Sequence, residues 1–279
     1  MNLKTVSLAI LAIFMAIPMI PAKSVAQDGK DNPLDPTPSR RQILVGPTVG
    51  IHRNYHSGGF RTISDPVCPF FEDGTGWGFA VGLSAEFLPS VDGRWGIIPR
   101  ITFEQRPGQF RQELPDVPVL VPNPIDPSTP EVVDQTISTT SDITYSLLNV
   151  ELMYKQEVLL LGDLRVGVLG GPAAQYIMGG TNRQVQDLDE PENARFINPD
   201  GLPTENNGRR LIFFDGDIPE RNATRFSVKA GVQGEIGLFN NQWAMTPGIY
   251  YDYGLSNVIS TEKWQLSSVI FQVDFRRAF

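Results

Sequence analysis

Two histidines are the candidates in this sequence for acid–base catalysis near neutral pH. They are His52 and His56, and the predicted topology would bring Ser57, Asp252 and Ser256 near them. A hydrolytic triad needs a nucleophile, a base and an orienting acid within hydrogen-bond reach. Histidines in such places are more often solvated polar residues than bases. We therefore predict no catalytic residue and keep a lipid-modifying enzyme as the alternative.

Acidic side chains and one cysteine offer the remaining candidate sites. The runs DLDE (187–190) and FDGD (214–217) carry carboxylates, which are hard ligands of the kind that Ca²⁺ prefers. Neither run has a complete calcium-loop spacing, so we interpret them as solvated loop and predict no metal and no cofactor. Cys68 is the single cysteine, which leaves an isolated loop thiol or an intermolecular disulfide. A net charge of −8 argues against a nucleic-acid partner.

A period of two in the hydrophobic residues identifies the elements that must position these groups. In WGFAVGLSAEF (77–87) every second residue is apolar, and those between are small or polar. This alternation is typical of a β-strand with one face in an apolar medium. Similar segments predict an all-β fold with eight strands, over residues 43–52, 77–87, 95–104, 142–157, 164–178, 225–239, 243–253 and 264–279.

The connections between these segments alternate in length. Short turns such as PSVDGR, LLGD and NNQ alternate with long segments, roughly 53–75, 107–140 and 179–223. This pattern is typical of an eight-stranded antiparallel up-and-down transmembrane β-barrel, with short periplasmic turns and long extracellular loops. The bulky face of each strand would then contact lipid. A soluble lipocalin-like barrel, with that face inward, is the architectural alternative.

The N-terminus has the features of a cleaved secretory signal peptide. Lys4 provides a positive charge, residues 8–20 are apolar, and small residues precede a predicted cleavage after Ala26. A retained membrane anchor is the alternative, but the apolar run is short for a spanning helix and contains proline. We divide the chain into a signal peptide (1–26), a flexible periplasmic lead-in (27–41) and a barrel (42–279).

Strand parity assigns a set of charged side chains to the predicted barrel interior. Six acids and five bases nearly balance, and an unpaired charge in a narrow interior costs free energy. We therefore predict an ion-pair network that plugs the lumen, with a proton or small-ion path as the alternative. The predicted members are Glu86, Arg100, Glu104, Glu151, Lys155, Arg165, Lys229, Glu235, Asp252, Asp274 and Arg276.

Tryptophan positions agree with a membrane barrel. Trp77, Trp95, Trp243 and Trp264 each begin a predicted strand. Indole rings favour the bilayer interface, so we predict that these four form aromatic girdles at the two rims. Counting by twos from the C-terminus places Trp264 on the interior face unless a bulge near residues 267–268 shifts the register.

The chain ends in FQVDFRRAF, with Phe271, Phe275 and Phe279 on one face. This ending resembles the signal that outer-membrane barrels present to the barrel-assembly machinery. With GTGWGFAVGLSAEF, SLLNVELMYK and LRVGVLGGPAAQYIMGG, it resembles the PorT-like outer membrane protein beta-barrel domain family of small Gram-negative barrels, over about residues 42–279. The resemblance implies location in the cell outer membrane and contact with its lipid, and these motifs carry no catalytic signature.

Taken together, the sequence predicts an outer-membrane barrel with a charge-plugged lumen. We expect a structural or interaction role, with a protein or surface partner bound through loops 53–75, 107–140 and 179–223. The alternatives are an outer-leaflet lipid-modifying enzyme, with His52 or His56 as its base, and a narrow channel or small-ligand binder.

Overall fold

A computed structural model describes eight ranges of the chain: 43–60, 71–89, 94–123, 129–161, 164–197, 201–239, 242–261 and 263–279. All of them fall within the unit Arg40–Phe279. The predicted signal peptide, the predicted lead-in and Cys68 lie outside the described residues. Among the residues that are described, no helix is long and apolar enough to cross a bilayer.

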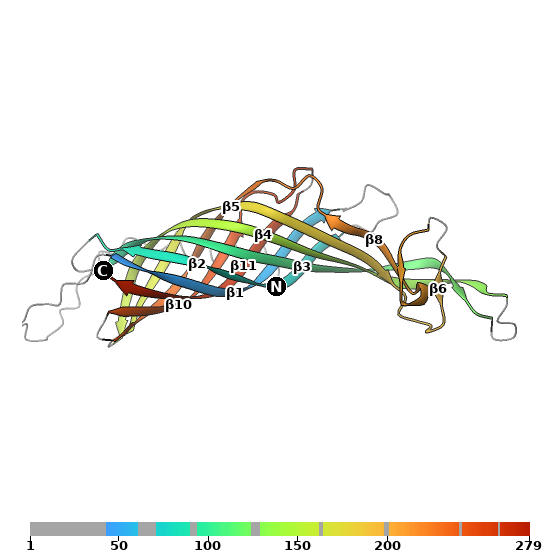
Figure 1. The fold of residues 1–279 in the computed structure, drawn as a ribbon, viewed down its shortest axis with the longest axis horizontal. Coiled ribbons are helices and arrows are strands. Elements are labelled where there is room, and N and C mark those ends of the chain that lie inside the picture. The colour runs from blue at the N-terminus through green and yellow to red at the C-terminus, as the bar shows by residue number, and fades with distance from the viewer. Residues whose placement is uncertain are drawn as a thin grey trace, which may run out of the picture. The chain divides into compact units, whose positions relative to one another are not determined.

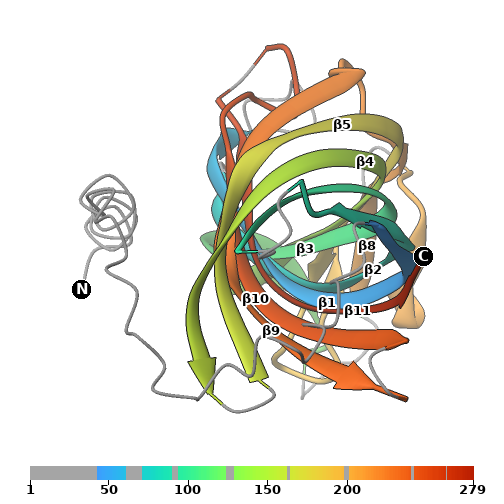
Figure 2. The same cartoon turned by 90° about the vertical axis from the view of Figure 1, so that its left-hand side faces the viewer.

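The described residues form one antiparallel sheet, in which eight strands close into a ring. Each ring strand pairs with its neighbours in chain order, β5 pairs with β9, and β11 pairs with β1 to complete the circle (Figures 1 and 2). The ring strands are β1 (Ile43–Phe60), β2 (Phe71–Phe87), β3 (Trp95–Val121), β4 (Glu131–Leu161), β5 (Leu164–Asp187), β9 (Thr224–Leu238), β10 (Trp243–Gly254) and β11 (Gln265–Ala278). The prediction of an all-β antiparallel fold is confirmed.

The registers around the ring show how strongly its strands are staggered. Successive cross-strand partners lead from Tyr154 once around the ring and back to β4 at Thr144, a displacement of ten residues (154 minus 144). With about 4.8 Å between strands and about 3.3 Å per residue, this stagger corresponds to a strand tilt of about 40°. A ring this narrow has room inside for side chains or one small ligand.

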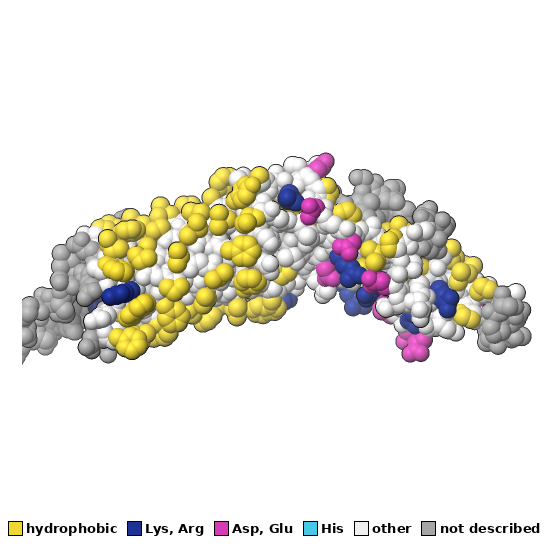
Figure 3. Space-filling model, viewed as in Figure 1, with side chains coloured by type: hydrophobic (Ala, Val, Ile, Leu, Met, Phe, Trp, Pro, Cys, Tyr) yellow, Lys and Arg dark blue, Asp and Glu magenta, His cyan; other side chains and the backbone are white. Residues whose placement is uncertain are grey.

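The alternation seen in the sequence separates two chemistries across the wall of the ring. Leu83 is 58% exposed on the outside, whereas Thr48 and Asp274 are buried inside. Hydrophobic side chains cover the ring in Figure 3. We call this zone the apolar belt, and it comprises the outward-facing side chains of residues 43–51, 77–87, 97–103, 148–154, 166–176, 226–238, 243–253 and 269–279.

Several strands continue past the belt at one end of the ring, which we call the long-strand end. The predicted loop 107–140 is mostly a paired hairpin, because β3 runs to Val121 and β4 starts at Glu131. The predicted loop 53–75 contains the ends of β1 and β2, and the predicted loop 179–223 contains the end of β5 together with β8 (Arg210–Asp217). These three loop predictions are therefore wrong in part.

Prolines and polar residues had suggested irregular structure in these segments. The strand β3 accommodates two of its prolines around a register shift between Leu114 and Val117, where Asp116 takes a left-handed φ of 57°. Proline has no backbone N–H to donate, and a bulge of this kind lets the strand accommodate it while the residues before and after stay paired with β4. The hairpin thus continues through its β3–β4 pairing, and β6 and the end of β5 pair with its outer edges.

The strands beyond the belt have a small apolar core of their own. We call this region the extension; it comprises residues 110–121, 131–141, 183–197 and 201–217. The segment after β5 returns to β3 through β6 (Arg195–Phe196) and continues through β7 (Thr204–Glu205) and the 3₁₀ turn η1 (Asn206–Gly208) to β8. The buried members of this core are Val119, Ile137, Leu188, Ala194, Phe196 and Leu211. The extension is consequently a packed structure rather than a set of independent loops.

Candidate functional site

The interior of the ring holds buried ion pairs, beginning near the short-turn end. Lys155 donates to Glu86 at 2.8 Å and to Glu235 at 2.6 Å. Arg276 contacts both Glu86 and Asp274. These side chains come from four different strands and meet across the interior because their residues share the inward parity. The same geometry that excludes them from the apolar belt brings them together.

Arg100 connects this group to the middle of the interior. Its guanidinium lies 2.7 Å from Glu151 and 2.8 Å from Asp274, and it donates to the Tyr250 hydroxyl at 3.0 Å. Lys229 contacts the other oxygen of Glu151. Each of these charged side chains is almost completely buried. Such charges are tolerated only when they are paired and hydrogen-bonded, and here both conditions hold.

A second group lies nearer the long-strand end. Arg106 contacts Glu104 and Asp252, each at 2.6 Å, and Arg225 lies 3.6 Å from Asp252. The Asn149 amide joins the two groups, because it donates to Glu104 at 3.0 Å and to Glu151 at 3.3 Å. We call the whole set the lumen network. Its charged members are Glu86, Arg100, Glu104, Arg106, Glu151, Lys155, Arg225, Lys229, Glu235, Asp252, Asp274 and Arg276.

The structure brings ten of the eleven predicted charged residues into this network and leaves one out. Arg165 is 37% exposed at the side chain, and its ion pair is with Glu157 at 3.6 Å. It sits next to the β4–β5 turn, where the ring interior meets solvent and parity no longer means burial. Arg106 and Arg225 were missed, although both follow the inward parity: Arg225 begins a predicted strand, and Arg106 lies two residues beyond the end of another. With them, acids and bases in the network balance at six each.

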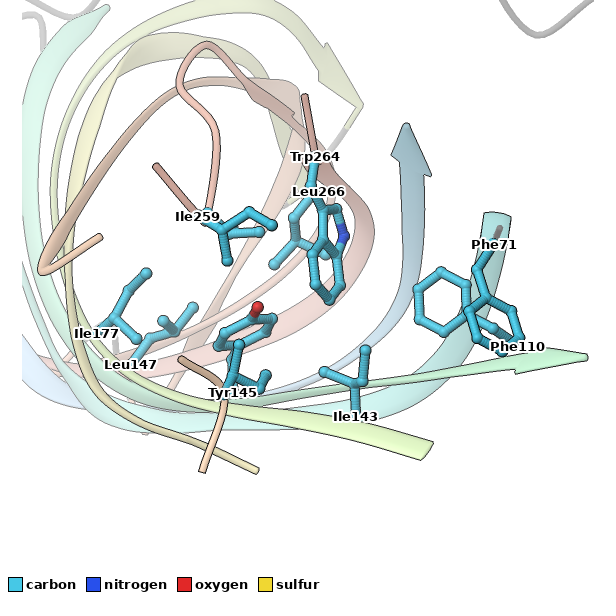
Figure 4. Packing of buried hydrophobic residues seen from close by; sticks show 11 residues of the cluster. Phe71, Phe110, Ile143, Tyr145, Leu147, Ile177, Ile259, Trp264 and Leu266 are labelled. Carbon is cyan, nitrogen blue, oxygen red and sulfur yellow. The ribbon is translucent and has the colours of Figure 1, made fainter. Parts of the chain in front are cut away.

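An apolar and aromatic cluster fills the interior above the network, at the long-strand end (Figure 4). Inward side chains of the strands, including Phe110 and Tyr145, pack with Val258, Ile259 and Trp264 of the connection from β10 to β11. Backbone hydrogen bonds hold this connection in place, among them Asn222 N to Val258 O at 2.9 Å. We call this cluster the plug, and its members are Phe71, Phe110, Ile143, Tyr145, Leu147, Ile177, Ile218, Val258, Ile259, Trp264 and Leu266.

Trp264 belongs to the plug and not to an aromatic girdle, so that prediction is wrong. It is 1% exposed, and its indole nitrogen donates to His56 Nδ1 at 3.2 Å. The β11 register continues without a bulge, which leaves Trp264 on the inward parity. Trp77 and Trp243 do face outward, at 64% and 38% exposure, and Trp95 stacks on Tyr154 with 6.1 Å between ring centroids.

His56 is buried between the plug and the lumen network, beyond the apolar belt. Its Nδ1 accepts from Trp264, and its Nε2 lies 3.3 Å from the Pro107 carbonyl oxygen, to which it donates. These partners fix a neutral ring with the proton on Nε2. Burial lowers the pKa of His56 to about 3, and the nearby charges of Arg106 and Arg225 act in the same direction.

We expect the free energy of unfolding to decrease as the pH is lowered, because His56 has a lower pKa in the folded protein than in the unfolded chain. The unfolded chain protonates His56 near pH 6.5, whereas the folded protein does so only near pH 3. Between these values the unfolded state binds more protons, so acidification lowers the free energy of unfolding, by about 2–3 kcal/mol at pH 4.5. Urea unfolding in detergent, followed by tryptophan emission from pH 7 to 4.5, measures this slope.

The control is His56→Phe, which removes the titrating group while keeping an aromatic ring. Its absolute stability is expected to be lower, because the Trp264 N–H loses its acceptor. Its pH slope over the same range should nevertheless be shallower than that of the wild-type protein. Equal slopes would contradict the assignment to His56.

Three further candidate catalytic groups, His52, Asp252 and Ser256, are engaged with other partners. His52 Nδ1 donates to Asn54 Oδ1 at 2.8 Å, and Ser268 donates to the same oxygen at 2.8 Å. Asp252 pairs with arginines of the lumen network. The Ser256 hydroxyl accepts the Phe226 amide at 2.9 Å. Each of these groups therefore has a structural role in this arrangement.

The acidic runs also contact basic side chains. Asp187 accepts from Arg210 at 2.6 Å, and Asp215 lies 3.7 Å from Arg183. Within the described ranges, His, Cys, Asp and Glu side chains form no group of three or more that could hold a metal ion. The arrangement fits surface ion pairs of the extension.

A family model described as "Outer membrane protein beta-barrel domain" matches residues 25–260. The chain belongs to this family. The closed ring is accordingly its β-barrel, and the interior of the ring is the barrel lumen. Membership points to the cell outer membrane, which agrees with an exterior that is apolar around the whole ring.

Two solved structures have some similarity to this chain. Neisserial surface protein A (NspA) is 10% identical with a TM-score of 0.36, over 85% of this chain and 97% of that one. The attachment invasion locus protein Ail of Yersinia pestis, in complex with a heparin analogue, is 10% identical with a TM-score of 0.30, over 84% and 99%. Among curated proteins, none matches this chain significantly.

Proposed function

We propose that this barrel spans the outer membrane, with its short turns in the periplasm and its extension outside the cell. The apolar belt supports this placement. On β2 the outward apolar residues run from Trp77 to Phe87, which at a tilt of about 40° corresponds to a height of about 25 Å. This height matches the apolar band of transmembrane barrels. Charged side chains gather over the extension in the view of Figure 3.

The proposed barrel is closed to diffusion and does not act as a pore. The observation that carries this proposal is the lumen network, whose side chains meet across the interior and are almost all buried, together with the plug above it. An open water-filled path would leave these groups exposed. The alternative of a narrow channel therefore has less support than a sealed scaffold.

Planar-bilayer recordings test this closure. We expect no steady single-channel conductance from the refolded full-length mature protein, because the buried side chains of the lumen network and the plug occupy the interior. Insertion is verified in the same preparation by the shifted electrophoretic mobility of an unboiled, folded barrel. A reproducible unit conductance from inserted protein would overturn the proposal and favour the channel.

The extension is the surface through which we propose that the protein acts, in a structural or interaction role with a protein or surface partner. Its apolar core and its ion pairs, such as Arg183 with Glu205 at 2.7 Å, support a defined shape outside the belt. The proposed role is non-enzymatic, since four of the candidate groups, His52, His56, Asp252 and Ser256, are bound to other partners. No catalytic function is needed to explain their positions.

We also propose export with signal cleavage after Ala26 and insertion by the barrel-assembly machinery, as in the narrower PorT-like group. The outward side chains of the C-terminal strand support the proposed insertion by the barrel-assembly machinery. Phe279 is 67% exposed on the outer wall, and its amide donates to Ile43 O at 2.9 Å. Phe271 and Phe275 share this outward face. An outward aromatic row at the C-terminus is available for recognition before the barrel closes.

A further inference from the structure

An arginine faces outward at the edge of the apolar belt, at its long-strand end. Arg53 lies on β1 between Trp77 of β2 and Val269 of β11 in the sheet register. Its guanidinium carbon is 5.5 Å from the centroid of the Trp77 ring, and its Nη2 donates to Thr75 Oγ1 at 2.6 Å. The guanidinium is therefore held in place on the outer wall rather than extending freely into solvent.

The side chains around Arg53 change character from one side to the other. Toward the middle of the belt, its outward-facing neighbours are Ile51, Phe79 and Phe271. Toward the long-strand end, they are three hydroxyl residues: Tyr55, Thr75 and Ser267. A positive charge thus lies between an apolar surface and a row of hydroxyl groups. A phosphorylated glycolipid such as lipid A has the same division, because its acyl chains hang from a sugar headgroup that carries both the phosphates and the hydroxyl groups.

The charge of Arg53 is not compensated by the described part of the protein. Among the described residues, no carboxylate forms an ion pair with Arg53, whereas every arginine of the lumen network has one. On the neighbouring strand β2, Asp73 is exposed and stands opposite Ser57, beyond the hydroxyl row. A guanidinium has a fork of donors suited to phosphate oxygens, and stacking on an indole leaves part of that fork available.

We propose that Arg53, Trp77 and the hydroxyls of Tyr55, Thr75 and Ser267 form a binding site for the phosphate headgroup of a glycolipid in the outer leaflet. The inference rests on the proposed function, because that function places the long-strand end of the belt at the outer leaflet. Arg53 binds the phosphate, Trp77 orients Arg53 at the interface, and the hydroxyls contact sugar oxygens. The acyl chains lie on Ile51, Phe79 and Phe271.

The opposite rim supplies a matched control. Arg277 also faces outward, and its guanidinium carbon lies 5.5 Å from the Phe279 ring centroid. It stands opposite Trp243 at the short-turn end of the belt. In the proposed orientation it faces the inner leaflet, so an outer-leaflet glycolipid cannot reach it. Arg53→Gln and Arg277→Gln therefore remove the same charge from a similar aromatic setting at the two rims.

The first experiment measures glycolipid that co-purifies with full-length protein from the outer membrane of a Gram-negative host in mild detergent. We expect Arg53→Gln to reduce bound lipid A per barrel about tenfold, Arg53→Lys to retain part of it, and Arg277→Gln to equal the wild-type protein. Equal retention by Arg53→Gln, or an equal loss in Arg277→Gln, would overturn the site.

The second experiment identifies the chemical group that is recognised. Native mass spectrometry of delipidated barrel is carried out with diphosphoryl lipid A, with its dephosphorylated form and with phosphatidylglycerol. Preferential binding of the diphosphoryl form that requires Arg53 supports the site. Equal binding of the dephosphorylated form, or of phosphatidylglycerol, overturns the assignment to a phosphorylated glycolipid.

Folding into the membrane is scored separately for every variant, by mobility shift and protease protection in vesicles. A wild-type barrel that does not insert would overturn the proposed function and this site with it. A barrel that inserts normally but binds lipid A regardless of Arg53 would overturn the site alone.

Discussion

Replacing Glu151 with leucine is expected to lower the free energy of unfolding by about 3–5 kcal/mol. Glu151 pairs with Arg100 and Lys229, and all three side chains are buried. Arg100 would keep Asp274 as a partner, but Lys229 would be left as a buried ammonium group without its contacting carboxylate. An uncompensated charge in the lumen costs far more than the lost pair itself contributed. Urea unfolding in lipid vesicles measures the effect.

The double variant Glu151→Leu with Lys229→Met separates these two contributions. Because both charges are removed, we expect it to recover most of the stability that the single change loses. Arg183→Ala provides the surface comparison, since its pair with Glu205 is about 40% exposed at both side chains. It should cost about 1 kcal/mol or less. If Glu151→Leu lowered the free energy of unfolding no more than Arg183→Ala does, the charges of the lumen network would not be closely coupled.

Replacing Leu83 with arginine is expected to cost about 2–4 kcal/mol when the protein is folded in a bilayer. Leu83 is 58% exposed on the outer wall and lies midway along the belt on β2, between Trp77 and Phe87. In a membrane, that position is close to the centre of the hydrocarbon layer, where a guanidinium must distort the bilayer or lose its hydration. Equilibrium unfolding in vesicles measures the cost.

Val132→Arg is the matched control, because Val132 is similarly exposed, at 56%, but lies in the extension. There the side chain meets water, so the change should fall within about 0.5 kcal/mol. A similar cost at both positions would contradict the membrane position of the belt. A soluble barrel would show no such dependence on position.

The belt and most of the lumen network could be predicted from the sequence because one rule governs both. Where one face of a strand meets an apolar medium and the other a polar lumen, residue parity determines each side-chain position. Leu83 and Glu86 follow this rule directly. The rule extends to Arg106 and Arg225, and they were missed only because the predicted strands ended at or near them.

The extension could not be predicted in the same way. Beyond the belt neither face of a strand contacts lipid, so runs such as EVVDQTISTT (131–140) lose the alternation that identified the ring strands. Its pairing is set by continuation of the β3–β4 hairpin. Its core takes single residues from β3, β4, β6 and β8 and two from the connection after β5. Trp264 was mispredicted for a different reason. The preference of indole for interfaces predicted an outward position and strand parity an inward one, and the buried position agrees with parity.

The closure between β1 and β11 has a consequence for the folding kinetics of the chain. Its contacts join residues more than two hundred positions apart, as in Tyr55 with Ser267. Arg276 of β11 reaches Glu86 only after this seam has formed. A half-assembled sheet would expose unpaired strand edges and uncompensated charges at the same time, so partly folded states are strongly disfavoured. The barrel should therefore assemble slowly, in keeping with its high contact order, and in a single cooperative step that the final strand completes.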